Sequence, residues 1–206
     1  MSSATKPLKQ HPPRERILQA ARELFYRDGI NAVSIDAVAA AAGTNKMTLY
    51  RHFQSRDELI AAYLEALAAE GEAVWEEARA AHPGDPHAQL RYLMRGVSQF
   101  AAESTGRGCA LANAAVELAE RKHPARKVVE AHKRRQCERL IALCREAGYA
   151  KPEQLADELF LLVEGARSSL QSVGPEGPGA RLFALAERLL DAAPLRKGSG
   201  KKLKTA

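Results

Sequence analysis

The sequence has few aromatic residues and no long apolar segment. Phe, Trp and Tyr make up 5% of the 206 residues. β-branched residues are also sparse, whereas alanine, leucine, glutamate and arginine dominate, and this composition favours helix throughout. No apolar run approaches the ~20 residues that a membrane-spanning helix needs, so we expect no membrane partner. Hydrophobic residues at 46% and charged residues at 27% are ordinary for a globular chain.

Cysteine is also scarce. The three cysteines, Cys109, Cys137 and Cys144, are an odd number with no signal peptide ahead of them, which argues against a disulfide framework. Cys137 and Cys144 fall on one helical pattern seven residues apart, about 10 Å along the axis. That separation is too long for a disulfide. We therefore expect a reducing, cytoplasmic location.

Sequence motifs of the common enzyme classes are missing as well. There is no Walker loop, no dinucleotide glycine motif, no HExxH and no nucleophile elbow. Neither the six histidines nor the cysteines have the spacing of a metal site. The sequence therefore predicts a protein that is not an enzyme, with no catalytic residue, no metal and no cofactor.

Charge is distributed unevenly along the chain. The formal net charge is +6, yet residues 1–56 alone carry +5 and residues 57–195 carry −4. The final segment, 196–206, adds five positive residues and no acidic ones. A basic amino-terminal part beside an acidic middle indicates one part that faces nucleic acid and another with a different role.

Hydrophobic periodicity predicts an all-α fold of about nine helices with no convincing strand. Glycine and proline clusters separate the apolar stripes and mark the breaks between helices. The pattern divides the chain into four parts: a disordered basic arm at 1–11, a helix-turn-helix domain at 12–63, a second helical domain at 64–195, and a basic disordered tail at 196–206.

Residues 34–53 read as two short helices joined by a glycine turn, which is a helix-turn-helix. Ser34 and Asn45 are suitable N-caps for the two helices, and Gly43 makes the turn. Leu49 and Phe53, four residues apart, form the buried side of the second helix. An unrelated helical hairpin would explain this pair, but not a solvent-facing Met47 or Tyr50.

The other side of the second helix is suited to DNA. Lys46 and Thr48 can reach base acceptors, and Met47 can pack on a thymine methyl group. Other side chains suit phosphate oxygens. Asp36 is acidic, so we expect it to favour the helix start and make no DNA contact. The predicted DNA-binding residues are Ser34, Asn45, Lys46, Met47, Thr48, Tyr50, Arg51, His52, Ser55 and Arg56.

These residues resemble the TetR/AcrR family of bacterial transcriptional regulators. The resemblance covers about residues 12–64 and lies in the segments ILQAARELFYRDG, SIDAVAAAAG, TNKMTLYRHF and SRDELIAAY. It implies a homodimer that binds a near-palindromic operator, usually as a repressor released by a small molecule. It also implies that residues 64–195 serve ligand binding and dimerisation, and that Thr44 belongs to the DNA-binding residues as well. Many members have a small residue where Met47 stands, so the base preference at that position differs.

The resemblance also implies that the last two helices pair with those of a second subunit. Small residues and an apolar stripe fit such a bundle, although both stripes could pack within one monomer. The predicted interface residues are Leu159, Leu162, Val163, Gly165, Ala166, Ser169, Leu170, Phe183, Ala186 and Leu190.

A ligand pocket between the fifth and eighth helices is implied in the same way. The candidate residues are polar or aromatic interruptions of apolar stripes, for each of which an ordinary core role is also open. They are Trp75, Phe100, Asn113, Glu117, His132, Gln136 and Phe160.

Two alternatives to a ligand-released repressor stay open. One is a cysteine-based redox-responsive regulator, because Cys109 follows a glycine loop and has Arg107 nearby. The other is a helical small-molecule-binding protein without specific DNA affinity. Salt-sensitive binding to a palindrome distinguishes a specific regulator from both a non-DNA-binding protein and a nonspecific one.

Overall fold

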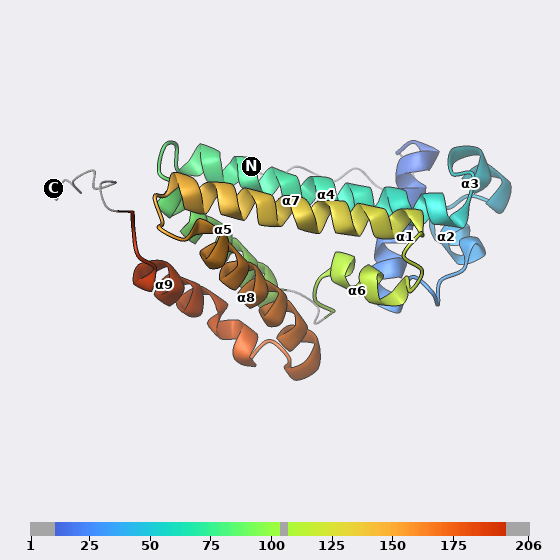
Figure 1. Ribbon diagram of the computed structural model, residues 1–206. Helices are drawn as coiled ribbons and strands as arrows, with labels where there is room; N and C mark the ends of the chain where they lie inside the picture. Colours follow the sequence, from blue (N-terminus) through green and yellow to red (C-terminus); the bar gives the residue numbers. More distant parts are fainter. Residues whose placement is uncertain (1–10, 104–106, 197–206) are drawn as a thin grey trace. The chain divides into compact units, whose positions relative to one another are not determined.

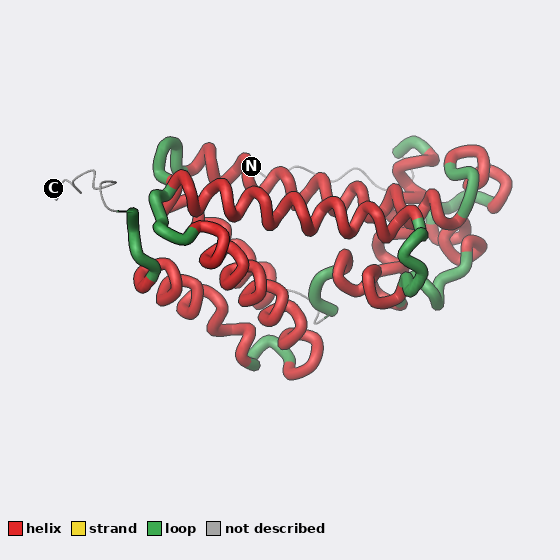
Figure 2. The backbone as a smooth tube through the Cα atoms, in the orientation of Figure 1, coloured by secondary structure: helices red, strands yellow, loops and turns green. Residues whose placement is uncertain are grey.

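The computed structural model describes residues 11–103 and 107–196, and these residues form an all-α fold (Figures 1 and 2). The predicted arm and tail lie outside the described residues, apart from His11 and Arg196. In chain order the helices are α1 (Pro13–Asp28), α2 (Ile35–Ala41), α3 (Lys46–His52), α4 (Arg56–Ala81), α5 (Pro86–Glu103), α6 (Ala110–Glu117), α7 (Pro124–Glu146), α8 (Pro152–Val173), the short 3₁₀ helix η2 (Pro178–Arg181) and α9 (Leu182–Ala192). Across the described ranges, no helix combines the length and apolar character needed to cross a membrane.

The described residues divide into two compact units. Unit 1 comprises residues 11–70 and 109–132, and unit 2 comprises the rest. The helix-turn-helix therefore shares its unit with α6 and the start of α7, which lie far from it in sequence. This division by packing differs from the predicted division by function, which placed residues 64–195 in one domain.

Local capping explains where the helices of unit 1 begin. Ser34 Oγ accepts a hydrogen bond from the Ala37 amide at 3.1 Å, and Asn45 Oδ1 accepts one from the Thr48 amide at 2.8 Å. Gly43, with φ +62°, makes the left-handed turn between α2 and α3. These features confirm the caps and the turn that the sequence predicts.

The core of unit 1 lies beneath the helix-turn-helix. Leu49 and Phe53 are fully buried there, with the apolar faces of α1, α2 and α4 around them. α6 adds Leu111, Ala114 and Leu118 to the same core. The other face of α6 is open, because Val116 there is 83% exposed.

Unit 2 is built on the packing of α5, α8, η2 and α9. Leu90, Leu159 and Leu182 are fully buried where these elements meet. Gly179 in η2 lies so close to α8 that a Cβ atom there would stand 2.8 Å from the Ala166 carbonyl oxygen. A glycine is therefore required at this crossing, because a side chain would push η2 away from α8.

We expect Leu49→Ala to lower the free energy of unfolding by about 2–5 kcal/mol, because it leaves a cavity under α3. Met47→Ala on the same helix is the matched control, since Met47 is 69% exposed. Its change should stay within about 0.5 kcal/mol. Urea unfolding followed by circular dichroism measures both. Equal losses in the two variants would contradict the orientation of α3.

Candidate nucleic-acid interface

The outward face of α3 carries a mixed set of side chains. Lys46, Met47, Tyr50 and Arg51 are exposed, whereas Leu49 between them is fully buried. Met47 and Tyr50 are large apolar groups that remain 69% and 40% exposed. An exposed apolar group beside two cations has no role in the packing of unit 1, so it is available to an external partner.

The start of each short helix offers further polar groups. Ser34, Thr44 and Asn45 lie at these ends, and Thr44 is partly buried. The Ser34 and Asn45 side-chain oxygens are already engaged as caps. The Ser34 hydroxyl retains its proton for donation, because it acts as an acceptor in the cap. Ser55 has the same arrangement, with its Oγ accepting from the Glu58 amide at 3.1 Å.

Asp36 lies in the first turn of α2, where the sequence predicts that it favours the helix start. Ser34 caps α2, and the Asp36 carboxylate pairs with the ammonium group of Lys46 across the helix-turn-helix, with 3.2 Å between Lys46 Nζ and Asp36 Oδ2. Both side chains remain exposed, at 55% for Lys46 and 67% for Asp36. The acidic group therefore lies on the same surface as the predicted DNA-binding residues.

Arg56 turns inward from its predicted position. Its guanidinium group donates to the carbonyl oxygens of Ile30 and, at 3.5 Å, Val33. These carbonyls belong to the segment between α1 and α2, which has no helical partners for its backbone groups. Arg56 therefore holds α2 in place, and we remove it from the set of phosphate-binding residues. His52 is half-buried, so its role at the surface is reduced.

A second contact to the same segment comes from α6. The Glu117 carboxylate accepts a hydrogen bond from the Asn31 amide at 3.1 Å, and the Glu117 carbonyl accepts one from Asn31 Nδ2 at 3.0 Å. Gly29, with φ +93°, allows this approach, since a Cβ atom there would lie 3.1 Å from Glu117 Oε2. Sequence reasoning missed this contact because the partners are 86 residues apart.

The start of α7 is tied to unit 1 by two side chains that the sequence analysis did not single out. His123 Nδ1 accepts from the Ala125 amide at 3.2 Å, which leaves the proton on Nε2, 3.2 Å from an Asp57 carboxylate oxygen. Arg126 donates to the carbonyl oxygens of Ala115 and Leu118 at the end of α6. Arg126 thereby satisfies helix-end carbonyls that have no partner within α6.

The chain resembles known proteins in sequence and in structure. Residues 17–63 match the family described as bacterial regulatory proteins, tetR family. The crystal structure of a TetR-family transcriptional regulator from Streptomyces coelicolor is 30% identical to this chain, with a TM-score of 0.82 over 87% of this chain and 94% of that one. The chain belongs to the TetR family.

Curated TetR-type relatives match over shorter stretches. The regulator UidR of Escherichia coli strain K12 is 42% identical over 53 residues, which are 26% of this chain and 27% of UidR. The regulator AcrR of Shigella flexneri is 31% identical over 94 residues, which are 46% of this chain and 43% of AcrR. The match therefore spans less than half the length of these two curated relatives, whereas the fold extends along 94% of the Streptomyces structure. Membership of a family of regulators agrees with the expectation that the chain is not an enzyme.

The residues predicted for a ligand pocket in this TetR-family chain do not gather in one unit. Asn113, Glu117 and His132 belong to unit 1, where Glu117 is engaged with Asn31. Trp75, Gln136 and Phe160 belong to unit 2, and the Phe100 side chain lies outside the described residues.

Two of the aromatic candidates in unit 2 are covered by cations. The Arg139 guanidinium lies 5.7 Å from the Trp75 ring centroid, and Lys133 Nζ lies 5.8 Å from that of Phe160. Arg139 also pairs with Glu72 at 2.7 Å. Each of these two rings therefore has one cationic neighbour within unit 2.

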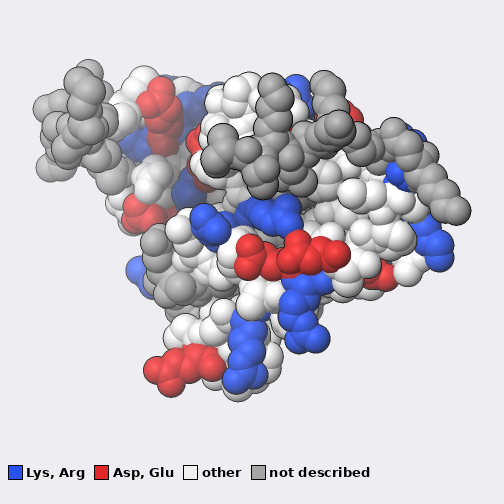
Figure 3. All heavy atoms as spheres, turned by 90° about the vertical axis from the view of Figure 1, so that its left-hand side faces the viewer, with Lys and Arg blue, Asp and Glu red and all other residues white. Residues whose placement is uncertain are grey.

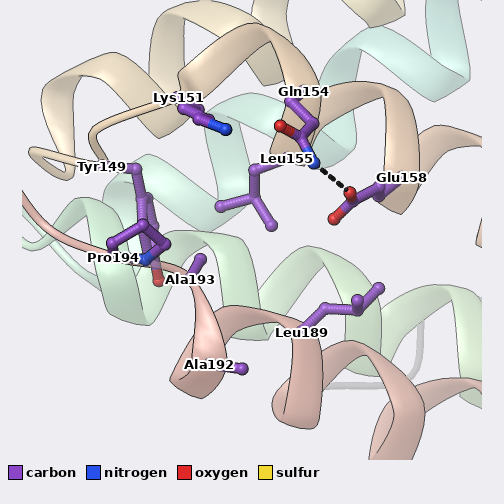
Figure 4. A pocket seen from close by; sticks show the side chains of 9 residues that line it. All are labelled: Tyr149, Lys151, Gln154, Leu155, Glu158, Leu189, Ala192, Ala193 and Pro194. Carbon is purple, nitrogen blue, oxygen red and sulfur yellow. Dashed lines mark hydrogen bonds between the residues drawn. The ribbon is translucent and has the colours of Figure 1, made fainter.

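A pocket of about 240 Å³ opens elsewhere in unit 2, between the first turns of α8 and the end of α9 (Figure 4). It contains none of the predicted ligand residues. Leu155 and Leu189 supply apolar surface, and Gln154 donates to Glu158 at 2.9 Å on one side (Figure 4). The full lining is Tyr149, Lys151, Gln154, Leu155, Glu158, Leu189, Ala192, Ala193 and Pro194.

The residues predicted for the dimer interface lie at both buried and open positions of α8 and α9. Five of them are buried in the core of unit 2, because the apolar stripes of α8 and α9 pack against each other, η2 and α5 within one chain: Leu159, Val163, Ala166, Ala186 and Leu190. Leu170 is also buried, outside that cluster. Leu162, Ser169 and Phe183 are half-buried, and Gly165 is exposed. The face of α8 that remains open carries Leu161, which is 69% exposed, with Gly165 and Ser168 beside it.

Charge is mixed on the face that Figure 3 shows. In Figure 3, which views the left-hand side of Figure 1, Lys and Arg side chains lie next to Asp and Glu side chains. Unit 2 contains ion pairs between Arg91 and Asp191 at 2.6 Å and between Arg145 and Glu153 at 2.7 Å. A face of alternating sign does not attract DNA phosphates. The exposed cations of α3 therefore form the better candidate surface.

We expect Arg56→Ala to lower the free energy of unfolding by about 1–3 kcal/mol, because two carbonyl oxygens lose a charged donor. The matched control is Arg51→Ala, which removes an exposed guanidinium for which the described residues include no ion-pair partner. Its change should stay within about 0.5 kcal/mol. Urea unfolding checks both variants. A stable Arg56→Ala protein would return Arg56 to the DNA-binding set.

Proposed function

We propose that this protein is a transcriptional regulator that binds a palindromic operator as a homodimer and is released by a small-molecule ligand. The observation that carries this proposal is the outward face of α3, where Met47 and Tyr50 are exposed beside Lys46 and Arg51. Membership of the TetR family supports it. A regulator of this kind acts on chromosomal DNA, so we also propose a cytoplasmic location.

Within this proposal, α3 lies in the major groove with its first residues against base edges. Lys46 and Thr48 donate to base acceptors, and Met47 packs on a thymine methyl group. Tyr50 and Arg51 bind phosphates and set the register of the helix. Ser34, at the start of α2, donates its hydroxyl proton to a phosphate on the other side of the groove.

Two copies of the helix-turn-helix are needed, because one copy contacts too few bases for useful specificity. We assign the contact between copies to the open face of α8. Leu161 is 69% exposed there, and no atom lies within 4 Å of a Cβ atom built on Gly165. The chain's own packing does not require that glycine, whereas a partner helix could approach it closely.

Release by a ligand requires two states that the ligand distinguishes. Helix α4 begins directly after the helix-turn-helix and continues into unit 2, so a ligand that favours a different position of α4 lowers operator affinity. We place the effector against unit 2, where Trp75, Gln136 and Phe160 stay candidates. The ligand shifts the balance only by its difference in affinity for the two states.

The two alternative functions are less well supported. A redox switch needs an accessible thiolate, and the candidate thiol, Cys109, is half-buried. Burial raises the pKa of the Cys144 thiol to about 12 and also raises that of Cys137, so neither supplies a second reactive group. These thiols stay protonated at neutral pH. A ligand-binding protein without DNA affinity leaves the exposed Met47 and Tyr50 unexplained.

Footprinting on the intergenic region next to the protein's own gene tests the proposal. We expect a protected palindrome whose half-sites lie about one helical turn apart. Lys46→Ala should relax base preference within each half-site, whereas Arg51→Ala should weaken binding to all sequences alike. Repeating the footprint with a panel of small molecules identifies an effector by loss of protection. Uniform binding to every sequence would contradict a specific regulator.

Leu161→Arg should shift the dimer to monomer and lower operator affinity at least tenfold, because it places two charges in a helix-to-helix contact. Analytical ultracentrifugation measures the subunit state. The matched control is Val116→Arg, which introduces the same charge at an apolar residue that is 83% exposed on α6. That variant should remain dimeric. If both variants remain dimeric, the interface does not lie on the open face of α8.

A further inference from the structure

We propose that Asp36 is a specificity-determining residue of the DNA-reading surface, acting through its ion pair with Lys46. This inference rests on the proposed function. Asp36 is the only acidic residue between positions 29 and 56, the segment that contains the helix-turn-helix. Its carboxylate oxygen lies 3.2 Å from the ammonium nitrogen of Lys46. The other exposed cation of α3, Arg51, forms no ion pair among the described residues.

The Asp36–Lys46 ion pair affects contacts with bases and contacts with phosphates differently. An ammonium group has three donors, so Lys46 can keep its bond to Asp36 and donate another to a base acceptor. Guanine O6 and N7 are neutral, and the carboxylate does not repel them strongly. A phosphate is an anion, and bringing it to Lys46 also brings it to the Asp36 carboxylate. Repulsion between like charges therefore offsets the attraction to Lys46.

The position of the pair supports this role over a stabilising one. Both side chains are more than half exposed, and exposed ion pairs contribute little to folding. Asp36 is also not needed as a cap, because Ser34 caps α2. The residue lies where an acidic group is unfavourable for a phosphate-binding surface, and its carboxylate neutralises one of the two exposed cations of α3.

The consequence is a lower affinity for DNA in general with little loss for the operator. Nonspecific binding depends almost entirely on phosphate contacts and on the counterions they release. Lys46 contributes little to that binding while Asp36 is paired with it. On an operator with a base acceptor opposite Lys46, the lysine contributes a sequence-dependent hydrogen bond. Asp36 thus increases the ratio of operator affinity to nonspecific affinity.

The test compares Asp36→Asn with the wild-type full chain on two duplexes of equal length, the footprinted operator and a scrambled sequence, between about 50 and 200 mM salt. We expect affinity for the scrambled duplex to rise about threefold to fivefold per subunit. The salt dependence of that binding should steepen by about one released ion per subunit. Operator affinity should change less than twofold, so the ratio of the two affinities falls.

Three further variants make the result specific. Glu65→Gln removes the same charge from an exposed position on α4, outside the reader, and should leave the ratio unchanged. Asp36→Glu should keep the ratio, because it restores the carboxylate. In a Lys46→Ala background, Asp36→Asn should behave like Glu65→Gln, since the carboxylate then has no lysine to neutralise.

An unchanged ratio in Asp36→Asn, or the same change in Glu65→Gln, would overturn the inference while leaving the proposed function intact. So would a loss of operator affinity larger than the gain on the scrambled duplex, because Asp36 would then orient Lys46 instead of excluding phosphate. A wild-type protein that binds both duplexes equally would instead overturn the proposed function itself. Circular dichroism of each variant confirms that the helices are retained.

Discussion

Leu49 and Phe53 anchor α3 in the core of unit 1, and this burial decides what the rest of the helix presents. A helix of seven residues is too short to be stable alone, so its position depends on packing. With 3.6 residues per turn, burying these two side chains turns Lys46, Met47 and Tyr50 outward together. Rotating α3 would bury a lysine and expose Leu49, and both changes are costly. The reading surface is therefore as rigid as the core beneath it.

The segment between α1 and α2 sets a second constraint, because its backbone groups lie outside any helix. Arg56 binds two of its carbonyls, and Glu117 binds the Asn31 amide. Unpaired backbone groups in such a place would destabilise the unit, so α2 depends on side chains from α4 and α6. This explains why residues 109–132 pack with the helix-turn-helix. A fragment that ends at residue 63 lacks Glu117 and the α6 part of the core.

Sequence reasoning predicted the parts of this structure that depend on near neighbours. The caps at Ser34 and Asn45, the turn at Gly43 and the buried pair in α3 all follow from spacing of three or four residues. It could not predict that Arg56 turns inward, since an arginine after a recognition helix suits a phosphate as well as a carbonyl. For α8, periodicity identified the apolar stripe but not its partner, and α9 of the same chain buries that stripe. The open side of α8, with Leu161, has no regular apolar pattern to indicate it.

The charge on the reader and the need for two subunits are connected. α3 exposes two cations, and Asp36 neutralises one of them, so a single copy has little attraction for DNA of arbitrary sequence. In a dimer the free energies of the two half-sites add, so any discrimination that one subunit provides is squared: a threefold preference becomes about ninefold. Adding more positive charge would strengthen both the operator and its competitors, and the competitors are far more numerous in a chromosome. A dimer with two weakly charged recognition helices therefore distinguishes the operator from other DNA better than a single, strongly charged recognition helix does.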